Sequence, residues 1–252
     1  MKAIARFLEL LPLAAAASLL LIRAASADAL DDRWHYLVGI PFWMPGISGD
    51  VQTATFNDIP VDASFSQLMS HFTFGAMLHA EARKERYGLG ADLFYINLSD
   101  ALDRERALPA LQTLSLGLKQ VLAELFGFYR VIEEGSSQNP SSFDLLGGAR
   151  FYWTQSEFDR FTDSLGWVDM MLGLRGQLAF GEHLNIRGRS DYAFLGSKFT
   201  WNLIGEAAWV FSEHWTASAG YRAMNIDYEN SSKNRTWDLN YHGPVVSAFY
   251  SW

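Results

Sequence analysis

The most regular feature of this chain is an alternation of apolar and polar positions with a period of two. Between residues 72 and 83, Phe74, Ala76 and Leu78 share one face and alternate with small or polar residues. This period is typical of a β-strand whose two faces meet different surroundings. The strands that it predicts are residues 33–43, 72–83, 87–98, 121–131, 143–154, 167–180, 184–195, 199–211, 215–228 and 237–252. Most have about ten to fourteen residues, longer than the usual strand of roughly five or six, and this length suits a tilted bilayer crossing.

The connections between these strands differ in length on the two sides of the predicted sheet. Short polar turns are expected on one side, at residues 84–86, 181–183 and 212–214. Longer connections are expected on the other side, at residues 44–71, 99–111, 155–166 and 229–235. Residues 196–198 are a short exception on the long side, and the Ser-rich stretch 133–142 is a long exception on the short side. This asymmetry is typical of outer-membrane β-barrels.

Two stretches carry a helical signal. Leucines recur between residues 108 and 125 at helical spacing, so the segment before residue 121 is interpreted as loop or surface helix. This ambiguity makes eight strands the alternative to ten. Within the first long connection, Ser64 is expected to cap a short helix that ends at Ser70.

The first 27 residues have the features of a secretory signal peptide. Lys2 and Arg6 give a positive start, residues 10–22 are almost all apolar, and Ala25-Ser26-Ala27 matches a cleavage site. The apolar run is too short to cross about 30 Å of hydrocarbon as a helix. We therefore expect a cleaved signal peptide at residues 1–27 and one barrel domain at residues 28–252.

Composition narrows the classes of function. Hydrophobic residues make up 49% of the chain and aromatic residues 15%, yet no stretch after residue 27 has eighteen consecutive apolar residues. A transmembrane helix is therefore not expected. Removal of the signal peptide takes three of 20 basic and one of 28 acidic residues, which leaves 17 against 27. A chain this acidic suits nucleic acid poorly, so no nucleic-acid partner is expected. The absence of cysteine rules out disulfides and a lipoprotein anchor.

Closure into a barrel explains where the charged residues fall. A bilayer offers backbone groups no water, so a sheet inside it must close on itself. A buried charge is costly unless it is paired, and arginine can bridge carboxylates with two hydrogen bonds. With the apolar face turned to lipid, seven acidic and seven basic residues fall on the inner face: Glu81, Asp92, Glu124, Asp144, Asp169, Asp191 and Glu206, with Arg83, Arg130, Arg150, Arg175, Arg187, Arg189 and Arg222. We expect them to form an ionic network inside the barrel; the alternative is the solvated face of a soluble sheet.

Aromatic residues gather near the ends of the predicted strands, where girdles lie at membrane interfaces. They are Trp34, Tyr36, Trp43, Tyr87, Tyr95, Trp153, Trp167, Trp215, Tyr228, Trp237, Tyr250 and Trp252. The chain ends on Trp252, with Tyr250 two residues earlier. This ending resembles the C-terminal assembly signal of outer-membrane barrels, although Phe is the usual last residue.

Several blocks of the sequence resemble uncharacterised small proteobacterial outer-membrane barrels of the OmpA-like β-barrel superfamily. The blocks are residues 43–49 (WMPGISG), 81–84 (EARK), 87–92 (YGLGAD), 147–150 (GGAR), 167–169 (WVD), 173–175 (GLR) and 190–192 (SDY). The resemblance covers most of the chain after residue 27 and brings no known catalytic residue. The expected fold is all-β: a closed antiparallel transmembrane β-barrel of about ten strands. The resemblance implies export through the periplasm to the Gram-negative outer membrane. The partners that it implies are outer-membrane lipid, including lipopolysaccharide, and the assembly machinery, and the protein is expected to be a monomer.

Two functions fit such a barrel. A barrel of eight to ten strands is largely filled by side chains, so a structural or surface-interaction role is the leading hypothesis. Its loops, above all residues 44–71, would then meet partners. The alternative is a narrow channel for ions or small solutes, for which the inward glycines could leave space: Gly75, Gly88, Gly90, Gly148, Gly173 and Gly220. These glycines can instead relieve crowding and allow curvature.

An outer-membrane hydrolase is a weaker alternative. His79 shares a face with Glu81, and His71 lies next to Ser70, but neither reproduces a recognisable catalytic motif. His183 and His214 fall in predicted turns. The six histidines are scattered and phosphate-binding glycine loops are absent, so we expect no catalysis, no metal and no cofactor.

Overall fold

In a computed structural model of the protein we describe residues 32–52, 59–70, 72–99, 116–136, 139–158, 161–230 and 235–252. The predicted signal peptide, residues 1–27, and the leucines between residues 108 and 115 lie outside these ranges. The elements are β1 (Trp34–Trp43), β2 (Gly46–Gln52), β3 (Ile59–Ala63), α2 (Phe65–Ser70), β4 (Phe72–Lys84), β5 (Tyr87–Ser99), β6 (Leu116–Gly135), β7 (Pro140–Phe158), β8 (Phe161–Phe180), β9 (Leu184–Phe194), β10 (Phe199–Val210), β11 (Trp215–Asn230) and β12 (Arg235–Ser251).

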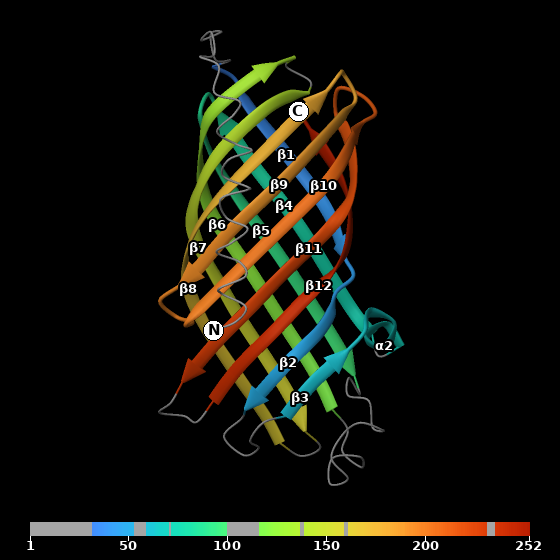
Figure 1. Cartoon of the computed structure of the whole chain (residues 1–252), viewed down its shortest axis with the longest axis vertical. Coiled ribbons are helices and arrows are strands. Elements are labelled where there is room, and N and C mark those ends of the chain that lie inside the picture. The colour runs from blue at the N-terminus through green and yellow to red at the C-terminus, as the bar shows by residue number, and fades with distance from the viewer. Residues whose placement is uncertain are drawn as a thin grey trace, which may run out of the picture. The chain divides into compact units, whose positions relative to one another are not determined.

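Ten of the strands in these ranges close an antiparallel barrel (Figure 1). Its order is β1-β4-β5-β6-β7-β8-β9-β10-β11-β12, and β12 pairs with β1 to complete the ring. The predicted barrel of ten strands is thus confirmed. The chain enters β1 and leaves β12 at the same end, which we call the terminal end; the two longest connections, between β1 and β4 and between β5 and β6, lie at the other end, where the predicted connections at residues 155–166 and 229–235 shorten to 159–160 and 231–234. The opposite end is the loop end, at the bottom of Figure 1.

Several strands are longer than predicted. β6 begins at Leu116 rather than at residue 121, so the interpretation of residues 116–120 as loop or helix is wrong. β7 and β8 extend to Phe158 and from Phe161, where a loop over residues 155–166 was predicted. The predicted loop at residues 133–142 shrinks to residues 136–139. The outer positions of these extensions are polar, as in the cross-strand pair Lys119 and Gln155, so the apolar alternation fades although pairing continues.

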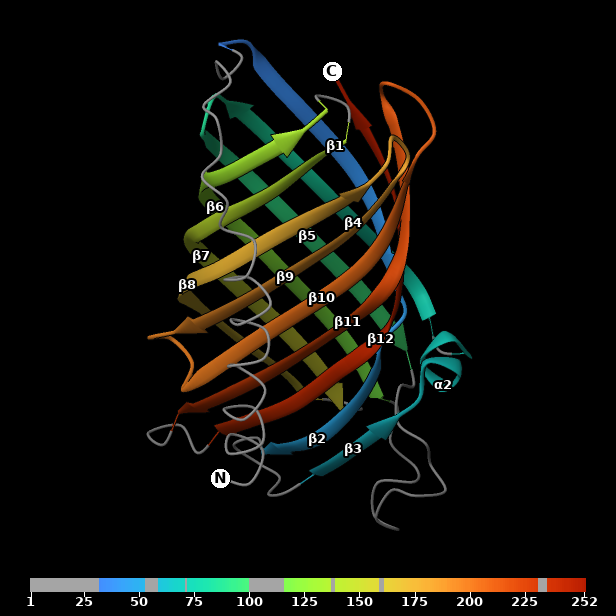
Figure 2. The ribbon, with the colours of Figure 1, turned by 45° about the horizontal axis from the view of Figure 1, so that its top comes forward.

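The predicted connection at residues 44–71 contains a hairpin that the sequence did not reveal. β2 continues along the edge of β12 after β1 and pairs with it from Gly46 to Gln52, and β3 then pairs with β2 (Figure 2). The short helix predicted here is confirmed as α2. The backbone N–H of Ser64 donates to Gln67 Oε1 (2.8 Å), and Leu68 N–H donates to Ser64 O (3.0 Å), an arrangement that satisfies the first turn.

The pairing between β1 and β4 covers only the half of these strands nearer the terminal end. Its last pair is Gly39 with His79, although β1 continues to Trp43 and β4 begins at Phe72, both toward the loop end. Beyond that pair the Trp43 backbone N–H contacts Met77 Sδ (3.2 Å). We call residues 40–43 of β1 and 72–78 of β4, between which the described ladder has no pairs, the β1–β4 seam.

The two faces of the wall exchange polarity along the barrel. On β11, Tyr221 faces outward and Arg222 inward; farther toward the loop end, Asp227 faces outward and Ile226 inward. The apolar outer band therefore gives way to a section whose outer face suits water and whose inner face is a hydrophobic core. Among the described residues, no helix is long and apolar enough to cross a membrane.

Candidate functional site: the barrel interior

Arg150 lies at the centre of the charged interior. It is fully buried, its Nε donates to Glu124 Oε1 (2.8 Å), and its Nη2 bonds Asp191. Arg189 reaches the same carboxylates, through Nε to Asp191 Oδ2 (2.8 Å) and through Nη2 to Glu124, and its Nη1 bonds Asp92 Oδ2 at 2.9 Å. The positive and negative groups alternate and neutralise one another, as buried charges require, although Arg150 Nη1 has no hydrogen-bond partner among the described residues.

A second group of charges surrounds Asp144. Its two oxygens accept from Arg130 Nε (2.8 Å) and Arg175 Nη2 (2.8 Å). Arg175 also pairs with Glu81, on β4, so one guanidinium links nearly opposite walls of the barrel. Through this bond and the contacts of Arg150 and Arg189, charged side chains cross the lumen.

A β-bulge brings in an acid that sequence reasoning placed in a loop. The β6–β7 register shifts between Arg130 and Ile132, which leaves Val131 as an extra residue. Glu133 then meets Arg130 (2.9 Å) and Arg83 (3.1 Å). Because a bulge changes the parity of all following positions, a strict period of two could not place Glu133 inside.

Two of the fourteen predicted charges are not paired with a residue of opposite charge. Asp169 accepts from the backbone N–H groups of Gly196 (2.8 Å) and Ser197 (2.6 Å), so it caps the turn between β9 and β10. Arg222 donates from Nε to Asn202 Oδ1 (2.9 Å), and within the described ranges no carboxylate lies within 4.0 Å of it. Arg187, the remaining arginine, pairs with Glu206 (3.2 Å). Equal numbers of acids and arginines therefore do not mean seven pairs.

Three arginines also stack on phenylalanine rings that cover inward glycines. The Cζ–centroid distances are 4.7 Å for Arg175 on Phe128, 4.9 Å for Arg189 on Phe126 and 4.3 Å for Arg187 on Phe249. The glycines paired across the strands with these rings are Gly88, Gly90 and Gly39 respectively, and a Cβ on any of them would overlap the ring. The space beside Gly88 and Gly90, which the channel hypothesis needs, is thus filled by Phe128 and Phe126.

The loop-end interior is filled by aromatic rings. This ring cluster consists of Trp43, Phe94, Tyr152, Trp167, Tyr228, Trp237 and Tyr241. Trp167 stacks between Tyr152 (4.7 Å between centroids) and Tyr228 (4.3 Å), and Gln120 on β6 donates to the Tyr241 hydroxyl on β12 (3.0 Å). Four of these rings were predicted to lie in an outer girdle, and that prediction is wrong: Trp43, Trp167, Tyr228 and Trp237 point inward and are buried.

The other predicted girdle residues at the terminal end do face outward. Trp34, Tyr87, Trp215, Tyr250 and Trp252 are exposed on the outer wall, in the position of an interfacial belt. The ring of Tyr250 contacts Trp215 (5.1 Å between centroids) and Trp252 (5.7 Å). These contacting rings lie where the last strand pairs with the first.

The histidines occupy structural positions. His79 is held between Asp92 (2.6 Å) and Glu81 (3.1 Å), and no hydroxyl of the described residues is bonded to it. His183 Nδ1 bonds the Val210 carbonyl (3.0 Å), which fixes a turn. His71 lies outside the described residues. Within the described ranges, no group of three or more His, Cys, Asp or Glu side chains is arranged to hold a metal ion.

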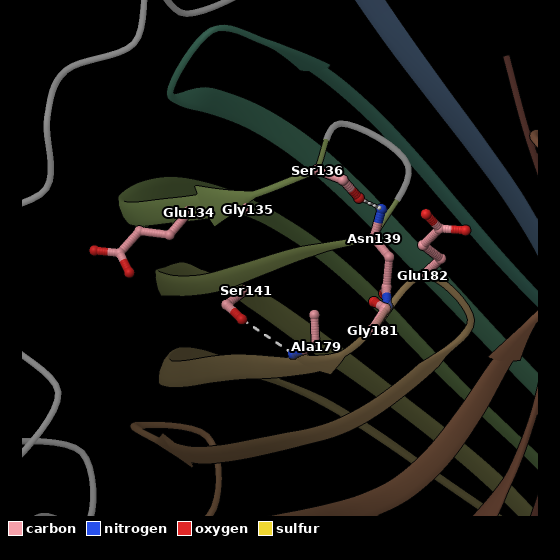
Figure 3. Close-up of a pocket in the computed structure, with 8 residues that line it drawn as sticks. All are labelled: Glu134, Gly135, Ser136, Asn139, Ser141, Ala179, Gly181 and Glu182. Carbon is pink, nitrogen blue, oxygen red and sulfur yellow. Dashed lines mark hydrogen bonds between the residues drawn. The ribbon is translucent and has the colours of Figure 1, made fainter.

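A shallow pocket of about 430 Å³ lies at the terminal end, between the β6–β7 and β8–β9 turns (Figure 3). The buried Asn139 donates from Nδ2 to the carbonyls of Gly181 (3.0 Å) and Leu184 (3.0 Å) and joins the two turns. Glu134 and Glu182 line the rim. The polar atoms of Asn139 are already bonded to protein, so this side chain connects the two turns and offers no free polar group to the pocket.

No protein-family model matches the sequence, and no curated protein matches it. Among solved structures, the outer-membrane protease OmpT from Escherichia coli has a TM-score of 0.50 and 8% identity, over 90% of this chain and 99% of that one. This chain has the fold of an outer-membrane β-barrel. Weaker similarity is found to the translocator domain of the autotransporter NalP from Neisseria meningitidis (TM-score 0.37, 10% identity, 99% and 97% covered) and to the KdgM porin (TM-score 0.27, 8% identity, 86% and 99% covered). At these identities the likeness concerns the fold alone.

Proposed function

We propose that the protein is an integral barrel of the Gram-negative outer membrane with a structural or surface-interaction role and a closed interior. The observation that carries the proposal is that side chains span the lumen at successive heights. Arg175 reaches Glu81 nearest the terminal end. Arg189 reaches Asp92 closer to the loop end, and Gln120 reaches Tyr241 in the ring cluster, closer still. Each bond joins strands on nearly opposite walls.

The proposal includes an orientation and partners. Both termini of the barrel lie at the terminal end, which we assign to the periplasm, and the loop end, which carries the two longest connections, faces the cell exterior. The apolar outer band contacts lipid, including lipopolysaccharide, and the protein acts as a monomer. Tyr250 and Trp252 serve as the signal for the assembly machinery. The protein is not an enzyme, since His79 is held by carboxylates in the interior rather than beside a nucleophile.

Conductance in a planar bilayer tests the closed interior. We expect the purified protein to give no steady current, and the double variant Trp167→Ala with Tyr228→Ala to stay closed as well, because it removes two stacked rings but leaves the Arg175–Glu81 and Arg189–Asp92 crossings in place. Unfolded protein would explain a silent double variant, so the heat-dependent shift in electrophoretic mobility is measured on the same sample. A steady current from the unmodified protein would contradict the proposal and support the narrow-channel alternative.

A further inference from the structure

Arg222 differs from the other arginines inside the barrel. Its Cζ lies 4.5 Å from the centroid of the Trp43 ring, its Nε donates to Asn202, and its Nη2 lies 3.8 Å from Met224 Sδ. Arg83, Arg130, Arg150, Arg175, Arg187 and Arg189 each lie within 4.0 Å of a carboxylate. In the part of the chain that the structure describes, Arg222 has no such carboxylate.

An unpaired cation in a closed interior attracts an anion. A buried charge is costly without a counter-charge, and Arg222 uses only Nε in a strong hydrogen bond. The planar fork of a guanidinium fits the two oxygens of a carboxylate or of a phosphate ester. The free edge of Arg222 therefore offers the contact that the other six arginines already make within the protein.

A second group beside Arg222 lacks a partner. Trp43 is 5% exposed, and its indole Nε1–H, among the described residues, has no acceptor. It belongs to the ring on which Arg222 stacks, so the two donors lie on side chains in direct contact. A buried donor is rarely left unpaired in proteins, and an anion bound to Arg222 would accept from it.

The surroundings suit a ligand with an apolar part. Trp43 lies on the β1–β4 seam, where Ile40 and Phe42 on β1 and Phe74 on β4 face outward and are exposed. Phe94 and Tyr241 of the ring cluster continue this apolar surface inward from Trp43.

We infer that Arg222 and Trp43 form an interior binding site for an amphiphilic anion. Its carboxylate or phosphate group bonds the Arg222 guanidinium and the Trp43 indole N–H, and its apolar part lies along the β1–β4 seam, toward the exposed Ile40, Phe42 and Phe74. The site is independent of the closed-barrel proposal, because a barrel that does not conduct can still hold a ligand.

Calorimetric titration of the protein in nanodiscs with sodium decanoate tests the inference, with partitioning into empty nanodiscs subtracted. We expect saturable binding that weakens at least tenfold in Arg222→Gln and a few-fold in Trp43→Phe, which keeps a ring but loses the N–H. The matched control is Arg83→Gln at the terminal end, which should bind decanoate as the unmodified protein does. Arg222→Lys keeps the charge without the fork and should bind with intermediate affinity.

Two further probes separate the parts of the ligand. Acetate should bind at least tenfold more weakly than decanoate, and decanol should not distinguish the unmodified protein from Arg222→Gln. Equal affinity of these two proteins for decanoate would overturn the inference, and acetate binding as tight as decanoate would overturn the apolar part. Each variant is first checked for the heat-dependent mobility shift; if Arg222→Gln does not fold, Arg222→Lys and Trp43→Phe decide.

Discussion

The main chain of Trp252 exchanges two hydrogen bonds with that of Tyr36: Tyr36 N–H donates to Trp252 O (2.9 Å), and Trp252 N–H donates to Tyr36 O (3.1 Å). Their rings also stack, with centroids 5.5 Å apart. The last residue of the chain thus closes the barrel against its first strand. The closure uses backbone groups that any residue supplies, whereas the ring contact requires an aromatic residue.

Deleting Trp252 should destabilise the barrel more than replacing its side chain. Deletion removes both main-chain hydrogen bonds, and we expect a loss of about 1–3 kcal/mol in the free energy of unfolding. Trp252→Ala keeps these bonds and should cost less. Urea titration of the protein in lipid vesicles measures both; an equal loss in the two variants would mean that the ring, and not the backbone, closes the barrel.

The proposed role of Trp252 in assembly predicts a different result in cells. Trp252→Ala should lower the amount of folded protein in the outer membrane severalfold, whereas Trp252→Phe should restore it, since an aromatic last residue is what the signal requires. Quantifying the heat-modifiable band in membrane fractions measures this. Normal amounts of Trp252→Ala would remove Trp252 from the assembly signal.

Gly90 should be far less tolerant of a side chain than Gly205. A Cβ on Gly90 would overlap the Phe126 ring on which Arg189 stacks, while a Cβ on Gly205 meets nothing within 4 Å. Overpacking of this kind typically costs about 1–3 kcal/mol, so Gly90→Ala should lower the unfolding free energy by that amount and Gly205→Ala by much less. Similar losses in both would show that strand propensity, not ring packing, sets the cost.

Arg150 should be the most sensitive arginine of the interior. Arg150→Gln leaves Glu124 and Asp191 with less positive charge in a fully buried place, and breaking a buried pair costs about 3–5 kcal/mol. Arg83→Gln should cost less than 1 kcal/mol, roughly as for a surface ion pair, because Glu133 keeps Arg130. Urea midpoints compare the two variants, and a reversed order would contradict the paired-charge description.

Three aspartates face one another across the outer wall of the loop end. Asp238 is directly opposite both Asp50 and Asp227, and like charges in this position repel. Asp238→Asn should therefore raise the urea midpoint slightly at low salt, and the gain should shrink in high salt. Asp62→Asn on β3 is the control; a gain that does not depend on salt would point to a cause other than repulsion.

The alternation of apolar residues was sufficient to predict the ten-stranded barrel because lipid imposes one rule on every outward position. The same rule predicts the correct face for Trp43. This residue is an odd number of positions from Trp34, so the two rings point to opposite faces of the strand. Only its position near a strand end favoured the outer aromatic girdle. Glu133 was beyond reach for a different reason, because the bulge at Val131 shifts its parity. The partners of Asp169 and Arg222 depend on contacts between distant strands, which no local pattern specifies.

The exchange of polarity along β11 means that the barrel wall continues beyond the apolar outer band. This farther section consists of paired strands around a hydrophobic core, and β11 and β12 stay in register as far as Asn230 and Arg235. In the proposed orientation the section extends beyond the lipid headgroups on the cell exterior. A partner that reaches its outer face would therefore meet strands held by backbone hydrogen bonds.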